Sequence, residues 1–233
     1  MPSLIARLSA ALPLACGCAL AHAARPFVTD DARIVDPGGY QIESFLKHQR
    51  DVREDEFWFL PAWNPRTSVE LTFGGYLLRN AEAGRAGTLI AQAKTLLRPL
   101  QANDFGLAVT LGALGQNPVA STDRLRWSPF VNMIGSRSWI DDAVVVHANA
   151  GLIDDRSGAV RRYTWGLGGE IAVGSRLWAI VETYNQEGEK PSSQTGLRYW
   201  VVQSRLQVDG TLGRQRIDPQ NRSWVSIGVR ILF

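Results

Sequence analysis

Two residues with catalytic potential, His147 and Asn149, lie two positions apart in one segment. Alternate residues of a β-strand face the same side, so an imidazole base and an amide that orients it would share one surface. No serine is placed beside His147 by spacing, because its neighbours are Val146 and Ala148. Nucleophilic catalysis requires nucleophile, base and orienting group within hydrogen-bond reach, so we predict no catalytic residue and no enzyme. A lipid-active enzyme, the alternative, requires a serine near His147 on a lipid-facing surface.

Two carboxylates on neighbouring segments, Glu170 and Glu182, are residue types suited to acid–base catalysis. Cationic side chains are available on other segments at Arg198 and Lys94. Pairing with these cations would turn the carboxylates into structural ion pairs, which explains the same residues without a reaction.

The residue spacing does not support a metal site or a phosphate site. His48 and His147 lie in distant segments, and both cysteines, Cys16 and Cys18, fall near the N-terminus, so no metal-ligand pattern is formed. The glycines of 166–169 stand within a predicted strand rather than between a strand and a helix, unlike those of a phosphate-binding loop. We predict no metal and no cofactor.

These residues stand in segments that alternate apolar and polar side chains from Gly38 to the C-terminus. Alternation by twos is the period of a β-strand, and long helical patterns are absent. The predicted segments are 40–46, 55–60, 67–78, 88–97, 104–114, 126–136, 143–153, 163–173, 177–185, 194–201, 206–213 and 223–233.

The connections between these segments indicate how the strands are arranged. Connections after odd segments, such as 79–87, are longer than those after even segments, such as 174–176. An even number of strands of ~10 residues, with short turns at one end and longer loops at the other, is typical of outer-membrane barrels. We predict an all-β fold, a transmembrane antiparallel up-and-down β-barrel of about 12 strands with short periplasmic turns and longer extracellular loops.

The tryptophans provide a second indication, since transmembrane barrels concentrate Trp and Tyr at both membrane interfaces. This division of the chain predicts all eight tryptophans at segment ends or in turns. A two-sheet sandwich, the alternative fold, would place some of them mid-strand in its core. We expect Trp127, Trp165 and Trp224 at the long-loop end, and Trp58, Trp63, Trp139, Trp178 and Trp200 at the short-turn end.

The N-terminus has the pattern of a secretory signal peptide. Residues 1–23 contain Arg7, then an apolar run, then an A-x-A motif that ends at Ala23. We predict export to the outer membrane of a Gram-negative cell, with a periplasmic lead-in at 24–39 and the barrel at 40–233. The lead-in has a second interpretation, in which it enters the lumen from the periplasm as a plug.

The face opposite the apolar one carries polar and charged side chains at mid-strand depth. A charge that faces lipid at the membrane midplane costs on the order of 2–4 kcal/mol, so these side chains are expected to face inward. The sequence is compatible with two hypotheses: an interior closed by paired charges, and a conducting pore. The predicted pore-lining residues are Glu43, Glu70, Gln92, Lys94, His147, Asn149, Glu170, Glu182, Arg198, Asp209 and Arg230.

Several stretches resemble a family of proteobacterial outer-membrane proteins labelled transporters or "MetA-pathway of phenol degradation" proteins. The stretches that carry the resemblance are RPFVTDDARIVDPGGYQIES, EFWFLPAWNP, TWGLGGEIAV, VETYNQEGEKPSSQTGLRYW and the last strand. The resemblance covers essentially the whole chain after residue 23. It implies a barrel that passes small hydrophobic or aromatic compounds, and it implies no catalytic residue.

These observations predict a passive outer-membrane channel, with a closed structural or surface-interaction barrel as the alternative. The expected partners are outer-membrane lipid, a small solute and the barrel-assembly machinery. Nucleic acid is not expected as a partner, because 25 basic residues nearly balance 22 acidic ones and no basic run is present.

The last strand also resembles the signal read by the barrel-assembly machinery, through Val229, Ile231 and the terminal Phe233. We expect deletion of Phe233 to impair assembly far more than its small share of buried area implies. The amount of heat-modifiable barrel in the outer membrane measures this effect. Normal amounts of barrel without Phe233 would show that this residue is no signal.

Overall fold

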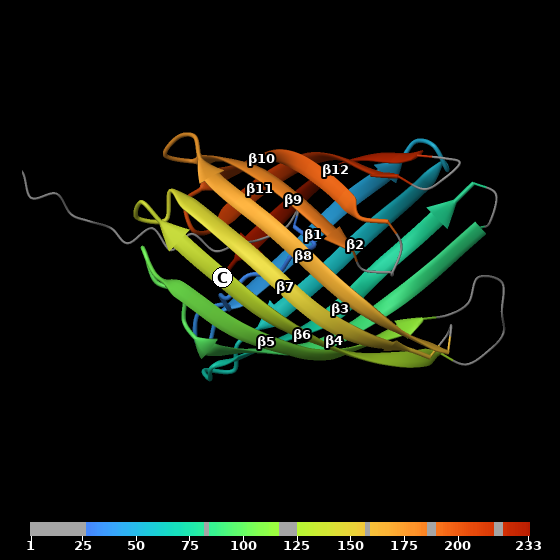
Figure 1. Ribbon diagram of the computed structural model, residues 1–233, viewed down its shortest axis with the longest axis horizontal. Coiled ribbons are helices and arrows are strands. Elements are labelled where there is room, and N and C mark those ends of the chain that lie inside the picture. The colour runs from blue at the N-terminus through green and yellow to red at the C-terminus, as the bar shows by residue number, and fades with distance from the viewer. Residues whose placement is uncertain (1–26, 82–83, 117–124, 157–158, 186–189, 217–220) are drawn as a thin grey trace, which may run out of the picture.

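The chain folds into a closed antiparallel barrel of twelve strands in this computed structural model, which describes residues 27–81, 84–116, 125–156, 159–185, 190–216 and 221–233 (Figure 1). Each strand pairs with its neighbours in sequence, and β1 pairs with β12. The strands are β1 Tyr40–Gln49, β2 Glu54–Trp63, β3 Val69–Asn80, β4 Gly84–Arg98, β5 Phe105–Gln116, β6 Arg126–Trp139, β7 Val144–Asp155, β8 Val160–Ala172, β9 Leu177–Asn185, β10 Ser192–Val202, β11 Leu206–Arg216 and β12 Asn221–Leu232.

The barrel closes where its first strand meets its last. Glu43 of β1 lies opposite Arg230 of β12, and the Tyr40 N–H donates to the Phe233 carbonyl over 3.2 Å. The end of the barrel at Tyr40 and Phe233 is called the terminal end below, and the opposite end the far end. Closure leaves no unpaired sheet edge, which a barrel in a membrane requires.

The outer surface of the barrel is apolar and the inner surface is polar. Phe73, Leu77 and Leu212 are exposed on the outside by 62%, 66% and 66%. Side chains at the alternating positions, such as Glu70, Lys94 and Thr211, are buried inside. This division confirms the predicted transmembrane barrel, because an apolar belt of this kind meets lipid. No helix among the described residues is long and apolar enough to cross a membrane.

The strands run further toward the far end than the sequence predicts. Strand β1 continues to Gln49 and β2 begins at Glu54, so their connection is residues 50–53 rather than 47–54. Paired strands of a barrel extend each other's ladder of hydrogen bonds beyond the positions where the apolar alternation ends.

The predicted positions of Trp58 and Trp165 are wrong, because both lie near the middle of their strands. Trp200 and Trp224 lie near the terminal and far ends as predicted, but they turn inward instead of joining an interfacial girdle, since Trp224 lines the lumen and Trp200 is almost fully buried. Trp63 and Trp127 lie exposed near the terminal and far ends. The lumen of this barrel is wide enough to require aromatic side chains as filling, a demand that segment ends do not reveal.

The lead-in is not a periplasmic tail in its described part, because residues 27–35 lie inside the barrel. Phe27, Ala32 and Val35 are buried, and the Asp31 side chain is only 3% exposed. The segment is irregular, with bends at 28–29 and at 32. We call residues 27–35 the plug. The position of the plug fits the second interpretation of the lead-in, since apolar side chains and acidic side chains both find partners in the lumen.

The β3 strand approaches its neighbours so closely that two glycines are required. A Cβ atom on Gly74 would lie 2.2 Å from the Phe59 carbonyl oxygen, and one on Gly75 would lie 2.0 Å from the Thr88 carbonyl oxygen. By contrast, a Cβ atom on Gly87 of β4 would meet nothing closer than 3.5 Å.

We expect Gly75→Ala to lower the free energy of unfolding by roughly 1–3 kcal/mol, because the added methyl group forces β3 and β4 apart. Urea unfolding of the barrel in detergent micelles, followed by tryptophan fluorescence, measures the change. Gly87→Ala is the matched control and should leave the midpoint nearly unchanged. Equal midpoints for the two variants would contradict the close approach.

Candidate functional site

The barrel contains a cavity of about 710 Å³ that reaches from the far end down to the plug. Its lining includes Glu54 and Arg222 at the far rim, and Phe27 and Asp30 of the plug. No residue of the described turns at the terminal end, 64–68, 99–104, 140–143, 173–176 and 203–205, lines it. We call this cavity the vestibule: it opens at the far rim and, alongside the plug, reaches Gln41 of β1 and Glu70 of β3 near the terminal end.

The structure places all of the predicted pore-lining residues on the inner face. Glu43, Glu70, Gln92, Lys94, Asn149 and Arg230 line the vestibule. His147, Glu170, Glu182, Arg198 and Asp209 are buried within the interior. They form separate groups rather than one ring of charges, and many of them contact the plug.

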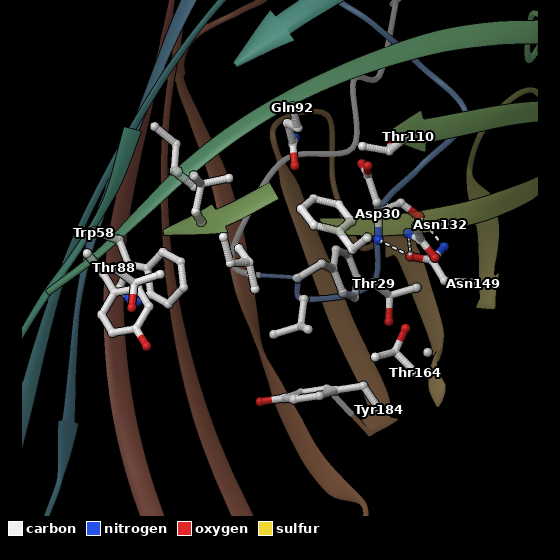
Figure 2. Close-up of a pocket in the computed structure, with 18 of the residues that line it drawn as sticks. Thr29, Asp30, Trp58, Thr88, Gln92, Thr110, Asn132, Asn149, Thr164 and Tyr184 are labelled. Atoms are coloured by element: carbon white, nitrogen blue, oxygen red, sulfur yellow. Dashed lines mark hydrogen bonds between the residues drawn. The ribbon is translucent and has the colours of Figure 1, made fainter. Parts of the chain in front are cut away.

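Two wall residues bind the main chain of the plug. The Glu182 carboxylate accepts hydrogen bonds from the N–H groups of Val28, at 2.8 Å, and Thr29, at 2.9 Å. The Asn149 side chain accepts from the Asp30 N–H at 2.7 Å and donates to the Asp30 carbonyl at 2.8 Å (Figure 2). Glu182 is thus a ligand for backbone amides rather than one half of an acid–base pair.

Lys94 binds the two adjacent aspartates of the plug. Its Nζ lies 2.7 Å from Asp30 Oδ1 and 3.1 Å from Asp31 Oδ1, and it is almost fully buried. Burial opposes a negative charge on Asp31, but Lys94 and Arg33 outweigh this effect and lower the pKa of Asp31 to about 2. Opposite charges of the plug and the wall therefore pair here, with Lys94 and Asp31 buried and Asp30 about one third exposed to the cavity.

The terminal half of the plug is held in the same way. Ser136 accepts a hydrogen bond from the Ala32 N–H at 2.9 Å, and Glu70 accepts from the Val35 N–H at 2.7 Å. Asn64, which follows β2, donates to the Val35 carbonyl at 2.7 Å. The methyl group of Ala32 is completely buried with Ala108 and Ile134.

A serine does lie beside His147, contrary to the expectation from spacing. Ser136 Oγ is 2.8 Å from His147 Nδ1, and His147 Nε2 is 2.9 Å from Glu170 Oε1. Arg198 donates to the other oxygen of Glu170 at 2.6 Å. Cross-strand pairing of β6 and β7 brings the serine and the histidine together, which sequence distance cannot reveal. Ser136 and His147 are buried beneath the plug, so a substrate has no space at the Ser136 Oγ.

One wall of the vestibule is aromatic. Trp58 stacks between Phe45 and Tyr76, with ring centroids 5.2 Å and 4.3 Å away. Trp58 and Thr88 face the plug residue Asp30 across the cavity (Figure 2). These rings come from consecutive strands β1, β2 and β3, so they form a continuous apolar strip inside a largely polar lumen.

No group of three or more His, Cys, Asp or Glu side chains among the described residues is arranged to hold a metal ion. The functional residues that sequence reasoning missed are Ser136, Asn64 and the plug's own backbone. Only the excess of acids and apolar residues in 27–35 pointed toward a buried role for this segment.

Solved structures of outer-membrane proteins share this fold. The KdgM porin aligns with a TM-score of 0.58 at 12% identity, over 83% of this chain and 99% of that chain. The COG4313 outer membrane channel from Pseudomonas putida F1 aligns with a TM-score of 0.58 at 13% identity, over 88% and 98%. An active-site mutant of outer membrane phospholipase A from Escherichia coli aligns with a TM-score of 0.51 at 11% identity, over 92% and 95%. At these identities the likeness establishes the barrel fold alone.

No curated protein matches the sequence significantly. One family model does match, over residues 11–233, and it covers the plug and every strand of the barrel. The label of the phenol-degradation family is not among these matches, so that resemblance stays a prediction. The chain belongs to the family described as "Uncharacterised conserved protein UCP029691".

Proposed function

We propose that this protein is a passive outer-membrane channel for small solutes and that the plug closes it at rest. The observation that carries the proposal is a vestibule that opens at the far rim and is narrowed toward the terminal end by the plug, which lines one side of it. Removal of the plug from its place would widen the vestibule toward the terminal end. In the outer membrane the far end would face the outside and the terminal end the periplasm.

The plug has the contacts of a segment that can leave. It is irregular, and it is bound by side chains rather than by a ladder of strand hydrogen bonds. Each of these hydrogen bonds contributes only ~0.5–1.5 kcal/mol net, or ~1.5–3 kcal/mol when a partner is charged, because water replaces the lost partner. The barrel strands would remain paired when the plug moves, since the plug is no part of the sheet.

The aromatic strip of the vestibule favours small apolar or aromatic solutes. Phe45, Trp58 and Tyr76 offer ring faces for stacking, and ion pairs such as Glu43 with Arg230, at 3.5 Å, offer orienting charges. Charges along the lumen would set selectivity, as they do in other pores. Outer-membrane lipid and the barrel-assembly machinery remain the expected partners, and export by residues 1–23 remains the expected route.

A closed structural or surface-interaction barrel is the second candidate. The completely buried side chains of Asn64, Ser138 and Gln207 near the terminal end favour it. The Ser136–His147–Glu170 arrangement is the feature that a lipid-active enzyme would use, but these groups face the plug rather than lipid.

A disulfide that locks the plug separates the first two candidates. The Thr29 Cβ lies 3.5 Å from the position of a Cβ on Gly168, which suits a disulfide with a Cβ separation of about 3.5–4.5 Å. We expect the oxidised Thr29→Cys, Gly168→Cys protein to show no conductance steps in planar bilayers. Reduction with dithiothreitol should restore the conductance steps of the Gly168→Cys single variant, which carries the same added side chain beside Phe27.

The single variant Thr29→Cys is the control, because it cannot form the disulfide once residues 1–23, with Cys16 and Cys18, are removed. Conductance that persists in the fully oxidised double variant would show that solutes do not pass the plug. An absence of conductance in every form, including a chain that begins at Asp36, would favour the structural barrel.

Removal of one ring from the aromatic strip tests the class of solute. Stacking is worth ~0.5–1.5 kcal/mol, so we expect Trp58→Ala to lower the flux of phenol relative to glycerol by about two- to tenfold. Solute uptake into liposomes measures both fluxes. Trp127→Ala, on the exposed outer rim, is the matched control and should leave the ratio unchanged. An unchanged ratio in Trp58→Ala would exclude the strip as a determinant of selectivity.

A further inference from the structure

We propose that the lumenal surface beneath the plug is a peptide-binding site, and that short peptides with two adjacent acidic residues compete with the plug for it. The plug would then be a ligand that is part of the same chain, and a free peptide would displace the plug from the lumen. The inference extends the proposed function, since it names a ligand class for the same lumen.

The upper part of the site recognises main-chain groups. Glu182 accepts from two successive N–H groups of the plug, at Val28 and Thr29, in a geometry that bent backbone offers to any anion. The Asn149 side chain accepts a hydrogen bond from the Asp30 N–H and donates one to the Asp30 carbonyl, as the backbone of a neighbouring strand would. Neither residue depends on the side chains at 28–30, so both would bind the same backbone in another peptide.

The lower part of the site continues this pattern. Ser136 accepts from the Ala32 N–H, Glu70 accepts from the Val35 N–H and Asn64 donates to the Val35 carbonyl. All of these wall residues are buried. These buried polar side chains would each lose a hydrogen bond without the plug backbone, although Ser136 would keep His147 and Asn64 would keep the Thr67 N–H. This cost favours a replacement ligand of the same chemistry.

Sequence preference in the site comes from a few side chains. Lys94 lies within 3.1 Å of both Asp30 and Asp31, so a peptide without an acidic pair would leave this buried cation with Glu70, its neighbour on β3, as the remaining negative charge beside it. Gly168 leaves room for Phe27 and Thr29, because a Cβ there would lie 3.1 Å from the ring of Phe27. Ala32 is fully buried, so the residue after the acidic pair must be small.

Binding of a labelled peptide FVTDDARIV to the full mature chain tests the proposal. The protein's own plug competes with the free peptide at an effective concentration of ~1 mM. The double substitution Asp30→Asn, Asp31→Asn in the protein weakens the binding of its own plug and so lowers this competition. We expect fluorescence anisotropy to show saturable binding at least tenfold tighter to this variant than to the unmodified chain. A further substitution, Asn149→Ala, should lower the affinity for the peptide by about tenfold or more, because two hydrogen bonds are lost.

The disulfide between positions 29 and 168 provides a second measurement on the full chain. In the oxidised form the site is occupied, so the peptide should not bind, and reduction should restore binding to the level of the Gly168→Cys single variant, whose added side chain lies against Phe27. A peptide with both aspartates changed to asparagine should bind at least tenfold more weakly than FVTDDARIV. Equal binding to oxidised and reduced protein, or no binding to folded Asp30→Asn, Asp31→Asn protein, would overturn the proposal.

Peptide binding and conductance are independent measurements. Binding to a chain that never conducts would support the site and refute the channel. Conductance without binding would refute the site and leave the channel in place. Heat-modifiable migration in gels shows that each variant is folded before either measurement is made.

Discussion

The rest of this structure depends on one constraint, the need to satisfy polar groups that face the inside of a closed barrel. The outer face meets lipid, so every charged side chain at mid-strand depth turns inward. Inside, Lys94 and Glu182 are buried too deeply for bulk water to serve them. The plug supplies the missing partners, with two aspartates for Lys94 and two backbone N–H groups for Glu182.

The same contacts explain how a filled lumen could open in the proposed channel. A plug of apolar side chains packed into the sheet would be a permanent core, costly to open. This plug buries a few apolar side chains, such as Ala32 against Ala108 and Ile134, but most of the contacts described above between it and the wall are hydrogen bonds and ion pairs, which water or another ligand can replace. The vestibule beside it is lined by the rings of Phe45, Trp58 and Tyr76, the surface on which the proposed solute would stack.

His147 lies within hydrogen-bond distance of both Ser136 and Glu170, but a substrate cannot reach these groups. Their distances match those of a nucleophile, a base and an orienting group. However, the Ser136 Oγ also accepts the Ala32 N–H of the plug, and the group is sealed from solvent. In the resting protein it couples the plug to the wall through Glu170 and Arg198.

The sequence by itself determined the barrel, the number of strands and the inward face, because a period of two is a local property of the chain that a membrane enforces along every strand. Strands as regular as 223–233 could therefore be predicted, and so could the inward position of Glu170 or Arg230. Only the tertiary structure decided that Ser136 meets His147 and that 27–35 fills the lumen. Those contacts join residues far apart in sequence through strand register and barrel closure, and no local pattern records them.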